Sequence, residues 1–305
     1  MKGFLKFLTI AASIILLSAV LAPILYDFLP FKFERIFNRL IMVLTLAAVF
    51  FFVRIRRGMF DDYGLARKPG SLAMFLAAFA TGFLVLSGLC AAYVMTGHAA
   101  WRPAPLGIGG WMIRFAGALA TGLAVGVLEE FFFRGVCYRA VLGRLSGGAN
   151  RQDFGQRMVW ASILIVSIFY SLVHFVSHEK PLIGPDPVFT DSLKLVAAPF
   201  ASLAHWKTLW PQALGLLIFG IILNRLVVKT GSLYASIGLH AGCVFYIKLN
   251  GALVDFLNNK TLMVGSSKLY DGITGWVVLA VMGVLLELLM ERFRLKSVSG
   301  NGRQR

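Results

Sequence analysis

The sequence predicts an all-α protein: a polytopic membrane bundle of about eight transmembrane helices. Two observations support this class. Of the 305 residues, 58% are hydrophobic and only 14% are charged, and the mean hydropathy is +0.77. In addition, apolar runs of about 20 residues, the length that crosses a bilayer as a helix, recur along the whole chain. Together these values exclude an ordinary soluble domain.

Each apolar run is interpreted as one span. The first resembles a signal peptide, but its apolar stretch exceeds the usual length, so we expect a retained helix. The fourth is too long for one crossing and should protrude or tilt. A very tight turn at 230–232 separates the sixth from the seventh. The predicted spans are 7–26, 38–53, 72–95, 111–142, 159–178, 210–228, 231–249 and 275–291.

The spans suggest three parts: 1–105 with three N-terminal spans, 106–250 as the core, and 251–305 with the last span and a basic cytoplasmic tail. The longest segment between spans is 179–209. Its second half is moderately apolar, which fits an interfacial or re-entrant piece, but a plain outer loop fits equally well.

The net charge of +16 could suggest nucleic acid, but its distribution indicates a membrane role. Most of the 30 lysines and arginines fall in segments that share one side when the N-terminus is inside. This bias predicts cytoplasmic termini, with the lipid bilayer as partner and no nucleic acid. The three cysteines lie in apolar segments without paired spacing, so we expect no disulfide framework and no thiolate metal site.

Two carboxylates and a guanidinium interrupt the fourth span. Glu129, Glu130 and Arg134 lie in the run 125–135, which is otherwise apolar. An ionisable group at membrane depth costs a few kcal/mol or more, so its default interpretation is functional. Glu130 and Arg134 are spaced i, i+4 and can pair on a helix. Glu129 points about 100° away, which leaves its carboxylate available as a general base for water activation.

Histidines on two other spans are predicted to share the depth of Glu129. His174 on the fifth span and Glu129 on the fourth both lie about 20 Å above the turn that joins these spans, and His240 lies about 15 Å above its own turn. A lone helical histidine is usually a packing residue. A carboxylate and two imidazoles at one depth can instead bind and activate water, with or without a metal.

These motifs resemble the CPBP family, which contains the CAAX prenyl endopeptidases and the bacterial Abi-type and bacteriocin-processing proteins. The resemblance covers about 110–250 and rests on Glu129-Glu130-x3-Arg134 and two histidine motifs. It implies an intramembrane endopeptidase with a CAAX-protease-like helical core. Glu129, His174 and His240 would be catalytic, and Glu130 and Arg134 supporting. The substrate would be a membrane-associated protein or peptide, and the location a bacterial cytoplasmic membrane.

The chain departs from the family pattern at two positions. Tyr170 stands where the second motif usually has Phe, a mild change. Val244 stands four residues after His240, where the family usually has Asn or another polar residue that supports the oxyanion. Asn224 or Tyr246 could substitute for it. If neither does, the protein is slow or inactive.

Three questions stay open from the sequence alone. A non-catalytic immunity or scaffold protein of the same fold is the main alternative to a protease, and a transporter is a weaker one. The family includes metalloproteases, so Glu129, His174 and His240 are candidate ligands for a divalent metal such as zinc. His178, one turn after His174, could also bind metal, although a place at the membrane interface suits it better.

Overall fold

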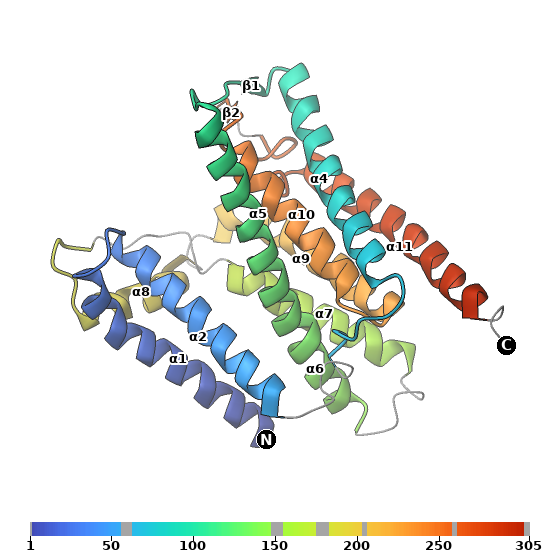
Figure 1. The fold of residues 1–305 in the computed structure, drawn as a ribbon, viewed down its shortest axis with the longest axis horizontal. Helices are drawn as coiled ribbons and strands as arrows, with labels where there is room; N and C mark the ends of the chain where they lie inside the picture. The colour runs from blue at the N-terminus through green and yellow to red at the C-terminus, as the bar shows by residue number, and fades with distance from the viewer. Residues whose placement is uncertain are drawn as a thin grey trace. The chain divides into compact units, whose positions relative to one another are not determined.

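The computed structural model describes residues 2–55, 63–147, 155–174, 183–202, 206–257 and 261–301. Helices account for nearly all of their regular structure, and the chain forms two compact units (Figure 1). The first unit comprises Met1–Met59 and His174–Leu209, and the second comprises Phe60–Val173 and Trp210–Arg305. The all-α membrane fold expected from the sequence is confirmed.

Among its described residues, the first unit holds three helices in full: α1 (Lys2–Tyr26), α2 (Phe33–Ile55) and α8 (Phe189–Ser202). Its core joins small residues of α1 to Phe33, Ile36 and Phe37 of α2. The helix α8 packs on α1, where the Ser192 hydroxyl donates to the Ala19 carbonyl oxygen at 3.1 Å. With 14 residues, about 21 Å, α8 is too short to span a bilayer. The segment 179–209 therefore contains a short packed helix rather than only a loop.

The second unit is built around α10. Its helices are α4 (Ser71–Met95), α5 (Ile108–Glu130), η1 (Phe131–Cys137), α6 (Tyr138–Leu145), α7 (Gln156–His174), α9 (Trp206–Thr230), α10 (Tyr234–Asn250) and α11 (Ile273–Asn301). The last residue of α7 and the first four of α9 are grouped with the first unit. The helix α10 packs against α4 and α5 and is buried on almost all sides (Figure 1).

Glycines set the distance between α10 and its neighbours. A Cβ atom added to Gly238 or Gly242 would lie 2.2 Å from a backbone carbonyl oxygen of α4. One added to Gly122 of α5 would lie 2.6 Å from the Ala241 carbonyl oxygen. Small residues permit this close approach, which is how membrane helices without a hydrophobic driving force gain packing energy. Because Gly238 and Gly242 flank His240, the same contacts fix the height of that imidazole.

Each of the eight predicted runs lies mainly on a helix, although 231–233 form a turn and 175–178 lie outside the described residues. In the part of the chain that the structure describes, six helices are long and apolar enough to cross a membrane. They are Leu8–Tyr26, Ser71–Met95, Ile108–Leu145, Gln156–His174, Trp206–Thr230 and Ile273–Glu291. The helix α10 is not among them: Gly231 adopts a left-handed turn (φ +65°), so α10 begins at Tyr234 and has only 17 residues, about 25 Å. The helix α2 is also not among them, and several of its side chains lie outside the described residues.

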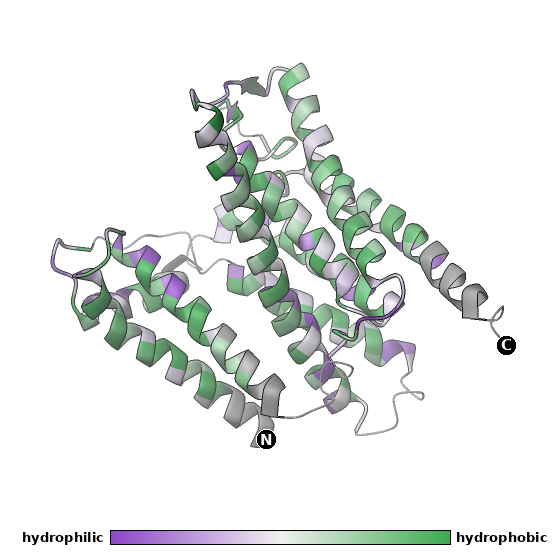
Figure 2. Ribbon diagram, in the orientation of Figure 1, coloured by the Kyte–Doolittle hydropathy of each residue, from purple (hydrophilic) through white to green (hydrophobic). Residues whose placement is uncertain are grey.

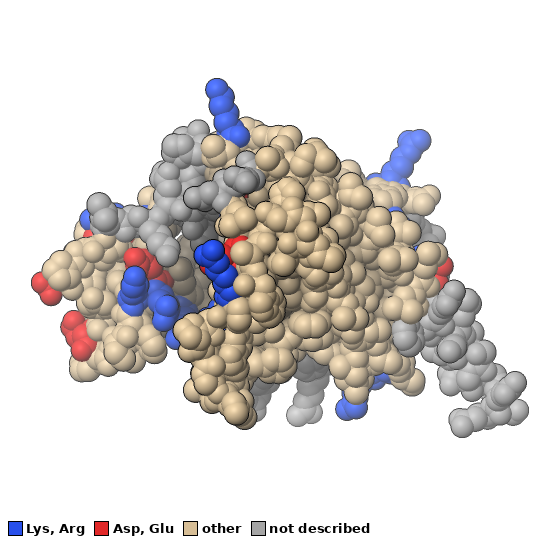
Figure 3. All heavy atoms as spheres, turned by 90° about the horizontal axis from the view of Figure 1, so that it is seen from above, with Lys and Arg blue, Asp and Glu red and all other residues tan. Residues whose placement is uncertain are grey.

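The long fourth run is confirmed as one continuous helical segment, Ile108–Leu145, formed by α5, η1 and α6. Hydrophobic residues predominate along the described helices, and hydrophilic residues gather at helix ends and connections (Figure 2). In Figure 3 most of the described surface belongs to uncharged residues, and several Lys, Arg, Asp and Glu side chains stand out toward the left of the view.

A short antiparallel ribbon, which the sequence did not predict, pairs β1 (Ala99–Trp101) with β2 (Val254–Phe256). Ala100 lies opposite Asp255. The ribbon connects the residues that follow α4 to those that follow α10. It thereby links segments that the sequence-based division places in different parts of the chain.

Candidate active site

The two glutamates and the arginine of the fourth span lie at the junction of α5 and η1. Glu130 Oε1 accepts a hydrogen bond from Arg134 Nη1 at 2.9 Å, and both side chains are completely buried. This is the i, i+4 pair expected from the spacing. The side chain of Glu129 is 30% exposed and is therefore the more accessible of the two carboxylates.

Arg134 lies within a π-helical turn, Phe131–Cys137. Such turns are rare and occur often at functional sites. The guanidinium carbon of Arg134 lies 4.4 Å from the centre of the Tyr170 ring on α7, and Nη2 donates to the Gly220 carbonyl oxygen on α9 at 3.4 Å. Arg134 therefore connects its own helix to α7 and α9 as well as neutralising Glu130.

His240 links the two glutamates from α10. Its Nδ1 lies 2.8 Å from Glu130 Oε1, a hydrogen bond in which the ring nitrogen donates to the carboxylate. Its Nε2 lies 3.9 Å from Glu129 Oε2, too far for a direct hydrogen bond. A single small hydrogen-bonding group could bridge that separation. Glu130 therefore orients the imidazole so that Nε2 faces Glu129.

Aromatic rings enclose His240. Tyr170 and Phe219 both meet the imidazole edge to face, with centroid distances of 6.2 and 5.5 Å. His240 itself is only 3% exposed. These apolar walls lower the local dielectric, which strengthens the attraction between the buried charges and raises the cost of leaving one unpaired. Nothing in the sequence singled out Phe219 or Gly220, because both are ordinary residues of an apolar helix.

The structure relates the two other candidate histidines, His174 and His178, less directly to the glutamates. His174 is the last residue of α7 and is grouped with the first unit, so its convergence with Glu129 and His240 stays a prediction. His178 lies outside the described residues.

The two candidates for a substitute oxyanion donor already use their hydrogens. Asn224 Nδ2 donates to Ser167 Oγ at 3.1 Å and to the Gly220 carbonyl oxygen at 2.9 Å, which occupies both amide hydrogens. The Tyr246 hydroxyl donates to Asn250 Oδ1 at 3.3 Å. In this arrangement neither residue offers the donor that is missing at Val244.

The described residues fit a metal poorly. Within these ranges no group of three or more His, Cys, Asp or Glu side chains has an arrangement that could hold an ion. Glu130 is already bound to Arg134 and to His240 Nδ1, so only Glu129 and His240 Nε2 of this cluster could become ligands.

Comparison with known families identifies the segment that carries the site. Residues 111–246 match the family model described as type II CAAX prenyl endopeptidase, Rce1-like. The match begins in α5, ends in α10 and includes both glutamates, Arg134, His174 and His240. No curated protein and no solved structure matches the chain. The resemblance inferred from the sequence motifs is confirmed, and the match is consistent with a CPBP family intramembrane protease.

Proposed function

We propose that this membrane protein, which carries an Rce1-like domain at 111–246, is an intramembrane endopeptidase that uses Glu129 as its general base. Its substrate would be a membrane-associated protein or peptide. One observation carries the proposal: His240 Nε2 faces Glu129 Oε2 at 3.9 Å while Glu130 holds the other ring nitrogen. A carboxylate and an oriented imidazole at this separation can share one water molecule.

In this mechanism Glu129 takes a proton from a water molecule that His240 and His174 help to hold. The resulting hydroxide adds to the carbonyl carbon of the scissile peptide bond. Protonated Glu129 then returns the proton to the leaving amine nitrogen as the C–N bond breaks. The Glu129 side chain is 30% exposed while its Oε2 is buried beside His240, so the proposed base borders both the surface and the enclosed site.

Glu130 and Arg134 act as positioning residues. Glu130 accepts a hydrogen bond from His240 Nδ1, much as a buried carboxylate orients a catalytic histidine in serine proteases. Arg134 Nη1 pairs with Glu130 Oε1 at 2.9 Å, where neither side chain is exposed. The aromatic contact with Tyr170 and the bond to the Gly220 carbonyl fix Arg134 in turn.

A non-catalytic immunity or scaffold role is the second candidate. It is favoured by Val244 and by the occupied donors of Asn224 and Tyr246, which leave the oxyanion without its expected support. Removing one such donor from other proteases costs about 3 kcal/mol in the transition state. A loss of that size slows a protease without abolishing catalysis, so we favour a slow enzyme.

The deciding experiment replaces Glu129 by Gln, which removes the base and keeps the shape. Protein fragments would be compared by N-terminal sequencing of membranes that contain the wild type, Glu129→Gln or a matched control, Glu291→Gln. Glu291 is a half-exposed carboxylate on α11, at the residue where the candidate membrane span of that helix ends. We expect some fragments to vanish only with Glu129→Gln, and the cleavage rate of a substrate identified this way to fall about 10²–10⁴-fold.

Full cleavage by a folded Glu129→Gln protein would exclude Glu129 as the base. The absence of any Glu129-dependent fragment would favour the scaffold. Treating the purified wild type with a chelator tests the metal question separately. Loss of cleavage that zinc restores would show that a metal takes part, and the water-activation step would then need to be revised.

A further inference from the structure

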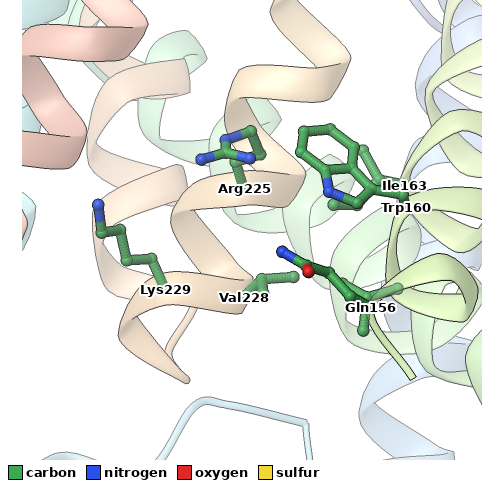
Figure 4. Close-up of a pocket in the computed structure, with 7 residues that line it drawn as sticks. Gln156, Trp160, Ile163, Arg225, Val228 and Lys229 are labelled. Atoms are coloured by element: carbon green, nitrogen blue, oxygen red, sulfur yellow. The ribbon is translucent and has the colours of Figure 1, made fainter. Parts of the chain in front are cut away.

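A cavity of about 390 Å³ opens between α7 and α9, away from the candidate active site (Figure 4). Gln156, Trp160 and Ile163 line it from α7, and Arg225, Val228 and Lys229 line it from α9. Its volume falls within the range of small-ligand sites. Its lining joins two basic side chains and an amide to an apolar wall, and the proposed peptide hydrolysis uses none of these residues.

Arg225 is held in the wall of this cavity from two directions. Its Nε and Nη2 both donate to the Glu287 carboxylate on α11, with an Nη2–Oε2 distance of 2.6 Å. Its guanidinium carbon lies 4.8 Å from the Trp160 ring centre. No hydrogen bond from Nη1 to a described residue accompanies these contacts. A guanidinium fixed in this way loses little side-chain entropy when a ligand binds to its remaining donors.

The cavity lies at the level of a membrane surface. Gln156 is the first residue of α7, Lys229 is the last but one of α9, and the candidate span of α11 ends at Glu291. The next turns of α7 expose Leu164, Ile165 and Ile168, as expected of a face in contact with acyl chains. Polar ligands at this depth, directly beside a lipid-facing surface, are above all lipid headgroups.

We propose that this cavity binds the phosphate of an anionic glycerophospholipid. Arg225 Nη1 and Lys229 Nζ would donate to the phosphate oxygens, and the Gln156 amide would donate from the start of α7, where the helix dipole also favours an anion. Trp160 would pack against the glycerol backbone, as tryptophans commonly do at membrane interfaces. The acyl chains would run along the exposed apolar face of α7.

Two carboxylates limit the positive charge of the site. Glu287 pairs with Arg225, and Glu291 accepts from Lys229 Nζ at 2.6 Å. With two basic and two acidic side chains, the site has no net charge and would attract an anion only weakly by electrostatics alone. A phospholipid gains in addition from chain burial and from the fixed geometry of Arg225. The site should therefore prefer a phospholipid over free phosphate.

The test uses the purified full-length protein in a neutral detergent. Bound lipid is counted by native mass spectrometry during titration with dioleoylphosphatidylglycerol, dioleoylphosphatidylcholine or inorganic phosphate at constant ionic strength. The main variant combines Arg225→Gln, Glu287→Gln and Lys229→Gln, which removes both positive charges without leaving a charged Glu287 unpaired. The control combines Arg102→Gln with Asp255→Asn, an ion pair that is about two-thirds exposed on both sides.

We expect one phosphatidylglycerol to bind the wild type and the control alike, and the triple variant to bind it about tenfold or more weakly, a difference of about 1.4 kcal/mol. Equal affinity of the triple variant and the wild type would overturn the proposal. Equal binding of phosphatidylcholine would overturn the preference for an anionic lipid, and competition by inorganic phosphate at similar concentration would identify a free-anion site instead.

If the triple variant proves unstable, Lys229→Gln alone provides the same comparison, because it leaves the Arg225–Glu287 pair intact. It should still weaken phosphatidylglycerol binding relative to the control. An unchanged affinity in a folded Lys229→Gln protein would count against the site.

Discussion

Two arginine–glutamate pairs in the second unit are built alike and placed differently. Arg134 pairs with Glu130 and lies over Tyr170, with no exposure on either side. Arg225 pairs with Glu287 and lies over Trp160, with side chains that are 36% and 17% exposed. The first pair binds a histidine that faces a second glutamate, and the second pair borders a cavity.

The difference in burial decides what each pair can contribute. A partly exposed pair is screened by water and stabilises a fold by at most about 1 kcal/mol. A fully buried pair must offset a large desolvation penalty, so its presence is weak evidence that it stabilises the fold. Removing only one partner is costly, because it leaves a buried charge unpaired. Among the described residues, Arg134 Nε and Glu130 Oε2 are buried without a hydrogen-bond partner. A pair left so incompletely satisfied is better explained by function than by stability.

The largest expected effect is that of Arg134→Ala. It leaves Glu130 buried without its cation, and the free energy of unfolding should fall by about 3–5 kcal/mol. Thermal unfolding of the purified protein measures this loss. The double variant Glu130→Gln, Arg134→Met should recover most of the stability but not the cleavage. If Arg134→Ala were as stable as the wild type, the buried pair would have no structural role.

Val244→Asn tests whether the missing hydrogen-bond donor to the oxyanion limits catalysis at the buried site. An amide one turn after His240 should restore a donor and raise the cleavage rate by up to about 10²-fold. The measurement is the initial rate of cleavage of a substrate found by the fragment comparison. Val244→Ala changes the volume without adding a donor and should not accelerate cleavage. Equal rates for the two variants would show that the missing donor does not limit catalysis.

Gly242→Ala should disturb the buried site and spare the Arg225–Glu287 pair. The added Cβ would lie 2.2 Å from the Phe79 carbonyl oxygen, so α4 and α10 must separate and His240 must move with α10. We expect a loss of about 1–3 kcal/mol in unfolding free energy together with reduced cleavage. Gly117→Ala on α5 meets no atom within 4 Å and is the matched control. Equal stability of the two variants would contradict the close packing.

Glu287→Gln should have the smallest effect. It removes the charge beside Arg225 but keeps the shape, and because the pair is partly exposed, the unfolding free energy should fall by about 1 kcal/mol or less. Urea or thermal unfolding in detergent measures the change, and Glu291→Gln, more exposed still, should change less. If Glu287→Gln lowered the unfolding free energy as much as Arg134→Ala, the two pairs would not differ in their contribution to stability.

Much of the fold and part of the site could be predicted from the sequence. Apolar run length located the helices, because a segment in lipid must satisfy its own backbone hydrogen bonds. The i, i+4 spacing predicted the Glu130–Arg134 pair, since such a contact depends only on local helix geometry. The rarity of charge in an apolar run singled out Glu129, and the ordered motifs led to the family that the match at 111–246 supports.

Other features were decided only by the tertiary structure, because they depend on contacts between distant segments. Local spacing could not show that His240 Nδ1 binds Glu130, since α5 and α10 are separate helices that only tertiary packing brings together. Whether Asn224 and Tyr246 had donors to spare depended on partners that no motif marks. Likewise, Arg225 and Glu287 lie 62 positions apart, and only helix packing brought them together beside Trp160. Spacing along a helix determines which residues share a face, whereas packing determines what that face meets.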